Sequence, residues 1–171
     1  MIGYWLLPED RARSWFRSLI EALAQKHDAP AFAPHVTLYS SDDSEEHARQ
    51  LIDRIAASYT QIELQIERIE TSEQFTKTLF VQFARNQDAQ QMSEALRVAA
   101  KSKCDYKFDP HLSLLYAHLR EETRRAEARA IAVPFDRVQF DQLAAVAFST
   151  PIETRADVET WRIIASARLP V

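Results

Sequence analysis

Apolar residues along the chain follow two different periods, which predict alternating strands and helices. Residues 1–7 form a mostly apolar run typical of a strand, and Pro8, with two acids behind it, suits the first position of a helix. The helix is supported by apolar side chains at helical spacing, namely Trp15, Phe16, Leu19, Ile20 and Leu23. Residues 35–39 then alternate with the period of a strand, so His35, Thr37 and Tyr39 are expected on one face.

The same alternation continues to the end of the chain. A second amphipathic helix is predicted from the apolar stripe of Ala48, Leu51, Ile52, Ile55 and Ala56. A third helix, with Asn86 or Asp88 as its cap, is predicted through residues 92–99, and a charged helix over residues 120–131. Further strands are expected at residues 62–66, 78–83, 135–140, 143–148 and 161–167.

One short segment occurs twice. Pro34-His35-Val36-Thr37-Leu38 has the same form as Pro110-His111-Leu112-Ser113-Leu114, and each follows one predicted helix and precedes another. The chain therefore reads as two copies of one unit, approximately residues 1–75 and 76–150, with a closing strand at 159–168. We predict a single α+β domain over residues 1–171, in which two antiparallel or mixed sheets, flanked by helices, face a central cleft with approximate two-fold symmetry.

Composition limits the classes of function. A net charge of −4 argues against a broad grip on nucleic acid, which needs a basic face. Gly3 is the only glycine, which excludes glycine-rich phosphate loops and the dinucleotide-binding fingerprint. Cys104 is the only cysteine, so no internal disulfide is possible and a reducing compartment, the cytoplasm, is expected. No secretory leader is evident at the start, and no apolar run suits a membrane helix.

The repeated segment carries the candidate chemistry. In each copy a histidine and a hydroxyl residue project from the same face of a strand, and an approximate two-fold axis would bring His35, Thr37, His111 and Ser113 together. One neutral imidazole can accept a proton from an attacking water while the other, protonated, donates to a leaving oxygen. The hydroxyls can donate to phosphate oxygens. A single His-x-Thr is a weak signal, but its occurrence twice in matched contexts favours a site for phosphodiester chemistry that needs no metal or other cofactor.

These segments resemble a known family. PHVTLY and PHLSLLY are similar to the paired motifs of the two-histidine phosphoesterases, and YWLLP, PHLSLLYAHLREE and a late ETW resemble their plant and yeast cyclic phosphodiesterases in particular. The resemblance covers most of the chain and is strong only in these segments. It implies metal-independent hydrolysis of ADP-ribose 1″,2″-cyclic phosphate to ADP-ribose 1″-phosphate, and of nucleoside 2′,3′-cyclic phosphates to 2′-nucleotides. It assigns acid and base catalysis to His35 and His111, and phosphate binding to Thr37 and Ser113.

Three aromatic residues are candidates for substrate binding. Trp5 and Tyr116 match positions that lie near the substrate in the family, and Phe75 precedes a strand in a polar segment that suits a loop over the site. Each also has a structural interpretation as a core or edge residue. Tyr116 lies three residues beyond Ser113, so a bulge or a strand end must bring the two to one side. Lys77 either balances a pyrophosphate or is simply solvated.

The other candidates favour structural roles. His27 lies near a helix end, His47 and His118 are expected to face water, Cys104 has no matched base, and Trp161 is expected in the core. Asp42, Asp43, Glu45 and Glu46 read as an acidic helix entry.

Three alternatives to a cyclic phosphodiesterase remain open. The first is a phosphodiesterase or ligase-like enzyme that acts on RNA ends, for which a local basic patch would be formed by Arg11, Arg13, Arg17 and the arginines within 120–129. The second is a nucleotide-binding module without turnover. The third and least favoured is a two-histidine metal site. The expected partner is a small cyclic nucleotide or an ADP-ribose cyclic phosphate bound by a monomer, with neither a membrane nor long nucleic acid involved.

Overall fold

All the strands belong to one sheet. The computed structural model describes residues 1–101 and 104–171. The strands are β1 (Ile2–Pro8), β2 (Val36–Ser41), β3 (Ile62–Thr71), β4 (Leu79–Phe83), β5 (His111–Leu115), β6 (Arg137–Ala147) and β7 (Arg162–Arg168). Over these described residues the helices are α1 (Asp10–His27), α2 (Glu45–Ala56), α3 (Gln87–Ala99), α4 (Glu121–Ala130) and α5 (Arg155–Glu159), together with the 3₁₀ turn η1 (Phe75–Lys77).

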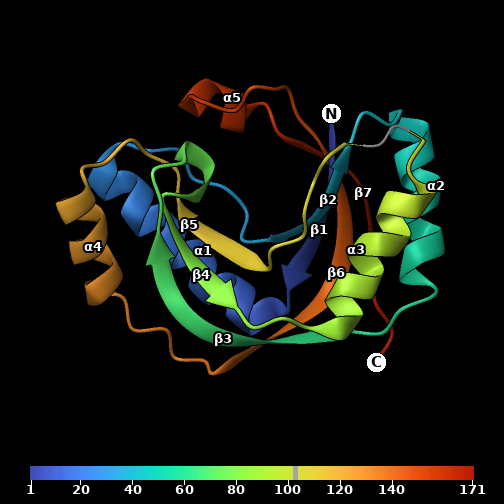
Figure 1. Ribbon diagram of the computed structural model, residues 1–171, viewed down its shortest axis with the longest axis horizontal. Coiled ribbons are helices and arrows are strands. Elements are labelled where there is room, and N and C mark those ends of the chain that lie inside the picture. Colours follow the sequence, from blue (N-terminus) through green and yellow to red (C-terminus); the bar gives the residue numbers. More distant parts are fainter. Residues whose placement is uncertain (102–103) are drawn as a thin grey trace.

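The sheet curls until it closes. Its order is β1-β2-β5-β4-β3-β6-β7, and β1 also pairs with β6, so six strands form a ring to which β7 is added. Every pairing is antiparallel. The predicted α+β class and antiparallel pairing are confirmed, and the two expected sheets are joined edge to edge. Figure 1 shows the resulting cup, with α1 and α4 at one side and α2 and α3 at the other.

The order of strands explains the closure. Strand, helix, strand, helix, strand occurs twice along the chain, from β1 to β3 and from β4 to β6. The last strand of each series pairs with the first strand of the other series: β3 pairs with β4, and β6 pairs with β1. Each three-stranded half of the ring is therefore completed by the other half of the chain, which makes the two halves one folding unit.

The two halves also meet at the seam between β2 and β5. One residue pair spans it, Val36 opposite Leu112. His35 immediately precedes Val36 and His111 immediately precedes Leu112, so both histidines lie at the seam. The antiparallel register of this pair places His35 across from Ser113 and Thr37 across from His111.

Helix starts and buried stripes follow local chemistry. The apolar stripe predicted for α2 is buried throughout, and the Asn86 side chain caps α3 by accepting from the Ala89 amide. The prediction that Pro8 is the first helical residue is wrong. Pro8 ends β1, and Glu9 caps α1 by accepting from the amides of Arg11 and Ala12. Pro8 has no amide hydrogen to contribute to the sheet, which suits its place at the register shift between Leu7 and Pro8 in the β1–β6 pairing.

One further prediction about the strands is corrected, and one helix was missed. Residues 135–140 and 143–148 were expected as separate strands, yet β6 is continuous across them. In the sequence, the polar Asp141 and Gln142 suggest a turn. In the structure, the Asp141 carboxylate is paired with Arg13 at 3.2 Å and with Arg168 at 2.6 Å. Because its charge is balanced in this way, Asp141 is accommodated within the continuous strand. The short helix α5 was not predicted. Within the described residues, no helix has both the length and the apolar character needed to cross a membrane.

Candidate active site

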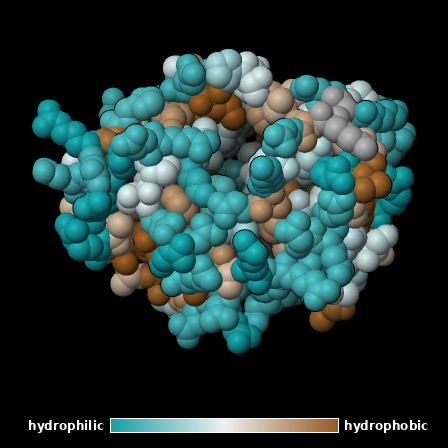
Figure 2. Space-filling view, viewed as in Figure 1, coloured by the Kyte–Doolittle hydropathy of each residue, from teal (hydrophilic) through white to brown (hydrophobic). Residues whose placement is uncertain are grey.

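The repeated His-x-Thr/Ser segments meet in one cavity of about 190 Å³. The surface is hollowed below the segment that carries α5 (Figure 2). The cavity is lined by Trp5, His35, Thr37, Ser40, Gln74, Thr76, Tyr106, His111, Ser113, Tyr116, Phe148, Ile152 and Trp161. The four groups expected to act together, two imidazoles and two hydroxyls, are therefore brought together by the closure of the sheet.

Both imidazoles are held in the same way. Nδ1 of His35 donates to the carbonyl of Ala33 at 2.7 Å, and Nδ1 of His111 donates to the carbonyl of Asp109 at 2.8 Å. A carbonyl can only accept, so each neutral ring carries its proton on Nδ1 and keeps Nε2 as an unprotonated acceptor. Each ring is anchored two residues upstream by its own chain, and its other nitrogen is left for chemistry in the cavity.

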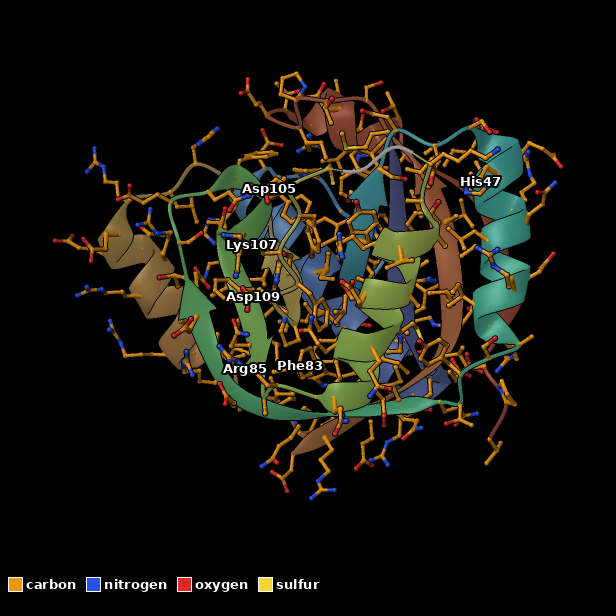
Figure 3. The ribbon with its side chains drawn as sticks, turned by 45° about the vertical axis from the view of Figure 1, so that its right-hand side comes forward. His47, Phe83, Arg85, Asp105, Lys107 and Asp109 are labelled. Atoms are coloured by element: carbon orange, nitrogen blue, oxygen red, sulfur yellow. The ribbon has the colours of Figure 1, made fainter. Side chains whose placement is uncertain are left out.

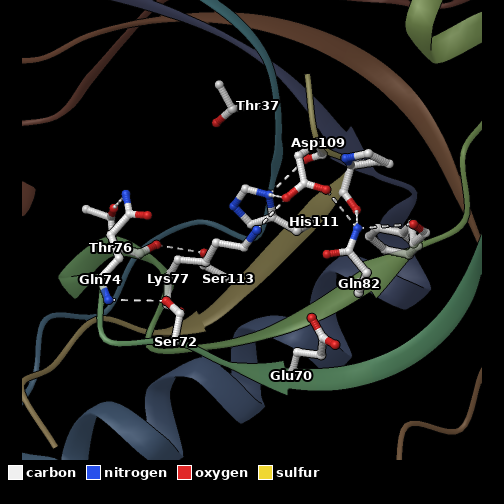
Figure 4. A network of polar contacts seen from close by, with 12 residues as sticks. Thr37, Glu70, Ser72, Gln74, Thr76, Lys77, Gln82, Asp109, His111 and Ser113 are labelled. Atoms are coloured by element: carbon white, nitrogen blue, oxygen red, sulfur yellow. Dashed lines mark hydrogen bonds and ion pairs between the residues drawn. The ribbon is translucent and has the colours of Figure 1, made fainter. Parts of the chain in front are cut away.

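The two hydroxyls are held differently. Ser113 is buried, and its Oγ donates to the carbonyl of Thr76 at 2.9 Å. Thr37 is half-buried in β2, and its own carbonyl accepts from the Tyr106 hydroxyl at 2.8 Å. Figure 4 shows Thr37 on one side of the His111 ring and Ser113 on the other. A bound oxyanion would require the Ser113 hydroxyl to turn from Thr76, which a hydroxyl rotor permits.

His35 lies among aromatic rings. The Trp5 indole stacks on it with ring centres 3.6 Å apart and an angle of 11° between planes, and Phe32 and Trp161 contact it edge to face. The side chain is almost completely buried. Burial lowers the pKa of His35 to about 4; the hydrogen bond to the Ala33 carbonyl acts in the opposite direction, and the charge of His111 lowers it further. The ring is therefore neutral at pH 7 in the free protein.

His111 lies in a polar environment. Burial and then the nearby Lys77 ammonium lower its pKa, and the carbonyl and carboxylate of Asp109 act in the opposite direction. The Asp109 carboxylate lies 3.9 Å from Nδ1 and is itself paired with Lys77 at 2.5 Å. The two histidines thus share one anchoring geometry but differ in electrostatic surroundings.

The three aromatic candidates are placed differently. Trp5 and Tyr116 line the cavity, and Tyr116 follows the end of β5, so the strand end allows it to share a side with Ser113. Tyr116 also stacks on Phe32 at 3.9 Å between ring centres, and burial raises its pKa. Phe75 lies outside the cavity lining, in η1, where it packs against Tyr116 and His118.

Sequence reasoning missed several lining residues. Trp161, expected in the core, is half-buried and forms one wall of the cavity, 5.3 Å from Trp5 between ring centres. It lies outside regular structure, just before β7, so no periodicity marks its orientation. Phe148 and Ile152 come from the same C-terminal region. The late ETW segment was the one available signal for this wall.

The other predicted structural residues lie outside the cavity. His27 ends α1, where its Nε2 contacts Glu127 at 3.0 Å, and His118 is exposed as predicted. The prediction that His47 faces water is wrong: it is half-buried, and its Nε2 donates to the Ala99 carbonyl at 3.1 Å, joining α2 to α3. Figure 3 shows it on α2, and it is not among the residues that line the cavity. The Cys104 thiol donates to the Ser40 carbonyl.

Known proteins are similar to this chain in sequence and fold. The family model for the 2'-5' RNA ligase superfamily matches residues 8–150. A cyclic phosphodiesterase from Arabidopsis thaliana is 25% identical over 169 residues, covering 96% of this chain and 93% of that protein.

Solved structures extend the likeness across the whole fold. Apo LigT from E. coli has a TM-score of 0.61 at 15% identity, with 99% of this chain and 97% of LigT covered. TT0787 from Thermus thermophilus has a TM-score of 0.62 at 15% identity, with 98% of this chain and 97% of TT0787 covered. The paired motifs, the closed sheet and the match to the family model all indicate the same family. The chain therefore belongs to the 2'-5' RNA ligase superfamily, and it is a phosphoesterase of the two-histidine type.

Proposed function

We propose that this protein hydrolyses the cyclic phosphodiesters of small nucleotides, without a metal, by acid and base catalysis from His35 and His111. The observation that carries the proposal is the matched anchoring of the two imidazoles: both Nδ1 atoms are bound by backbone carbonyls and both rings line one cavity with two hydroxyls. The substrates are those implied by the family resemblance, ADP-ribose 1″,2″-cyclic phosphate and nucleoside 2′,3′-cyclic phosphates.

In the proposed step, water attacks phosphorus and gives up a proton to the Nε2 of one neutral imidazole. The phosphorus–oxygen bond to water forms as one ester bond of the ring breaks, and the leaving oxygen takes its proton from Nε2 of the other, protonated imidazole. The hydroxyls of Thr37 and Ser113 donate to the non-bridging oxygens as their charge grows. A bound phosphate anion also favours the protonated imidazole, which offsets the effect of burial on its pKa.

The size and lining of the cavity support a small substrate. The volume of about 190 Å³ lies below the ~300–1,000 Å³ of common ligand pockets, which favours a compact group such as a cyclic phosphate, and the flanking Trp5, Tyr116 and Trp161 offer apolar faces to the rest of the nucleotide. Among the solved neighbours, E. coli LigT has structures in complex with 3'-AMP, with ATP and with NADP+. We infer that this cavity also takes a nucleotide.

The test is turnover by purified protein in EDTA. Each cyclic phosphate is supplied separately, and the products are identified by phosphorus NMR. The parent should form ADP-ribose 1″-phosphate and nucleoside 2′-phosphates. The variants His35→Ala and His111→Ala should each lose about 10²–10⁴-fold in kcat, the usual contribution of general acid and base groups. Full activity in either variant would contradict the paired mechanism, and 3′-phosphate products would contradict the proposed choice of bond.

His47→Ala is the matched control, because this histidine joins α2 to α3 outside the cavity. It should keep the parent kcat.

A second candidate function, joining or cleaving RNA ends, is favoured by the family's name. The same imidazoles would serve a displacement of the same kind, in which a 5′-hydroxyl replaces water as the nucleophile, one ester bond of the cyclic phosphate breaks, and the released ribose oxygen takes a proton. The proposed basic patch is partly neutralised, however, because Arg13 pairs with Asp141 and Arg125 with Glu121. Incubation with two RNA fragments, one ending in a 2′,3′-cyclic phosphate and one beginning with a 5′-hydroxyl, distinguishes the candidates: a joined product supports the ligase, and hydrolysis alone supports the phosphodiesterase.

A further inference from the structure

A charged pair lies directly behind His111. Oδ2 of Asp109 lies 3.9 Å from the His111 Nδ1, and Nζ of Lys77 donates to the same Oδ2 at 2.5 Å. The Asp109 carbonyl is at the same time the acceptor of the His111 Nδ1 proton. Figure 4 shows these contacts converging on one side of the imidazole. One residue therefore contacts the ring through both its backbone and its side chain.

Both members of the pair are fixed by other contacts. The Nε2 of Gln82, which is buried and lies opposite His111 in the β4–β5 register, donates to Asp109 Oδ1 at 3.0 Å and to the Pro110 carbonyl at 3.0 Å. The Lys77 ammonium lies 4.3 Å from the centre of the Phe80 ring, and this ring also packs against His111. Gln82 and Phe80 therefore fix the pair and the imidazole relative to one another.

The equivalent position beside the other histidine carries no charge. The segments Phe32-Ala33-Pro34-His35 and Phe108-Asp109-Pro110-His111 differ at one position, where Ala33 corresponds to Asp109. Both residues supply the carbonyl that holds Nδ1, at 2.7 and 2.8 Å. The carboxylate of Asp109, with the ammonium that pairs with it, is thus the difference between two otherwise matched segments.

We propose that Asp109 and Lys77 are positioning residues that orient His111 and balance the charge at its Nδ1, so that its ring exchanges a proton during the reaction. This inference rests on the proposed function, because it assumes that His111 takes part in proton transfer. The Asp109 carboxylate favours the imidazolium, and the Lys77 ammonium opposes it. The charged form of His111 in turn contributes to the lowered pKa of His35 across the cavity.

Because Asp109 and Lys77 carry opposite charges, removing each should shift the pKa of His111 in opposite directions, and this difference tests the proposal. The pKa of His111 is measured by NMR titration of its ring without substrate, in Asp109→Asn and in Lys77→Met. We expect Asp109→Asn to lower this pKa, Lys77→Met to raise it, and the double variant to return it toward the parent value. Because Asp109 is half exposed, both effects should shrink in high salt. Equal shifts in the same direction, or no shift, would overturn the proposal.

Kinetics separate positioning from substrate binding. On a 2′,3′-cyclic nucleotide, each single variant should lose about tenfold in kcat with little change in KM, a small part of the ~10²–10⁴-fold that general acid and base groups supply. An increase in KM alone for Lys77→Met would show instead that Lys77 binds the substrate. If the pKa of His111 shifts as expected but the parent protein turns over no cyclic nucleotide, the proposed function is contradicted. The electrostatic effect of Asp109 and Lys77 on His111 would still stand.

The chain offers matched controls on the segment that leads into β5. Asp105 and Lys107 are exposed on the same side as Asp109 and two or four residues before it (Figure 3). Asp105→Asn and Lys107→Met make the same chemical changes outside the contacts with His111. Both should leave the titration of His111 and the kcat unchanged, and a shift as large as that of the paired variants would overturn the proposal.

Discussion

At the scale of single residues, the packing around Trp5 prepares one half of the site. Its indole stacks on His35, and the edge of the same indole lies close to Gly3, the only glycine of the chain. A Cβ added at Gly3 would lie 2.8 Å from the Trp5 Nε1 and 3.0 Å from a carbon of the Phe148 ring. Gly3 does not have a positive φ, so the requirement there is for space rather than for backbone freedom.

The first residue-scale prediction concerns this close contact. Gly3→Ala should force Trp5 away from His35, lowering the free energy of unfolding by about 1–3 kcal/mol, the usual cost of overpacking, and reducing kcat/KM. Urea unfolding and steady-state kinetics measure the two effects. In Gly3→Ala/Trp5→Phe the smaller ring should relieve part of the loss. Strictly additive losses in the double variant would refute the explanation by crowding.

At the scale of elements, the buried carboxylate of Glu127 joins α1 to α4. The Glu127 carboxylate, on α4, accepts from Lys26 Nζ at 2.6 Å and from His27 Nε2 at 3.0 Å, both at the end of α1. Burial disfavours the charged carboxylate, but the hydrogen bonds from Lys26 and His27 hold the pKa of Glu127 below its ordinary value. The positive charge of Lys26 at the end of α1 also suits the helix dipole. These contacts hold the helices against β5 and β3, away from the cavity.

Removing this carboxylate should therefore reduce stability and spare activity. Glu127→Ala leaves the largely buried His27 without its partner, so we expect a loss of about 1–3 kcal/mol in urea unfolding and a kcat/KM within about twofold of the parent. Glu122→Ala, on the exposed face of the same helix, is the control and should leave both values unchanged. A large loss of activity in Glu127→Ala would mean that the helix pair also shapes the site.

At the scale of the whole molecule, closing the sheet has an acid–base consequence. The ring is closed through β1 and β6, which buries Trp5 and with it His35. The folded protein keeps His35 neutral down to about pH 4, whereas the unfolded chain binds a proton near pH 6.5. The unfolded state therefore gains protons first, and the free energy of unfolding falls as the pH decreases from about 6.5 to about 4.

His35→Gln should flatten this dependence. Each pKa unit corresponds to about 1.36 kcal/mol, so the parent should lose roughly 3 kcal/mol more stability than His35→Gln between about pH 7 and about pH 4. Urea unfolding at several pH values measures the difference, and subtracting the two curves removes the contribution of the carboxylates. His118→Gln, an exposed replacement, should follow the parent. Parallel curves for the parent and His35→Gln would show that burial of His35 is not linked to acid stability.

The sequence by itself determined most of the helices and strands and pointed to the four candidate groups of the site. Period and capping predicted α2 and α3 because these signals depend on residues within one or two turns. His35, Thr37, His111 and Ser113 were found because the same short segment occurs twice, and repetition is visible without a structure. The continuous β6 was missed because the partners of Asp141, Arg13 and Arg168, are distant along the chain.

Only the tertiary structure decided what surrounds the two histidines. The repeated segments predict two similar imidazoles, yet one lies against Trp5, Phe32 and Trp161, and the other beside Asp109 and Lys77. Trp161 reaches the site from the C-terminal region, and Lys77 from the turn before β4. Local periodicity fixes which face a side chain occupies, but it carries no information about which distant segment covers that face. The closure of the sheet supplied those neighbours, and with them the difference between the two histidines.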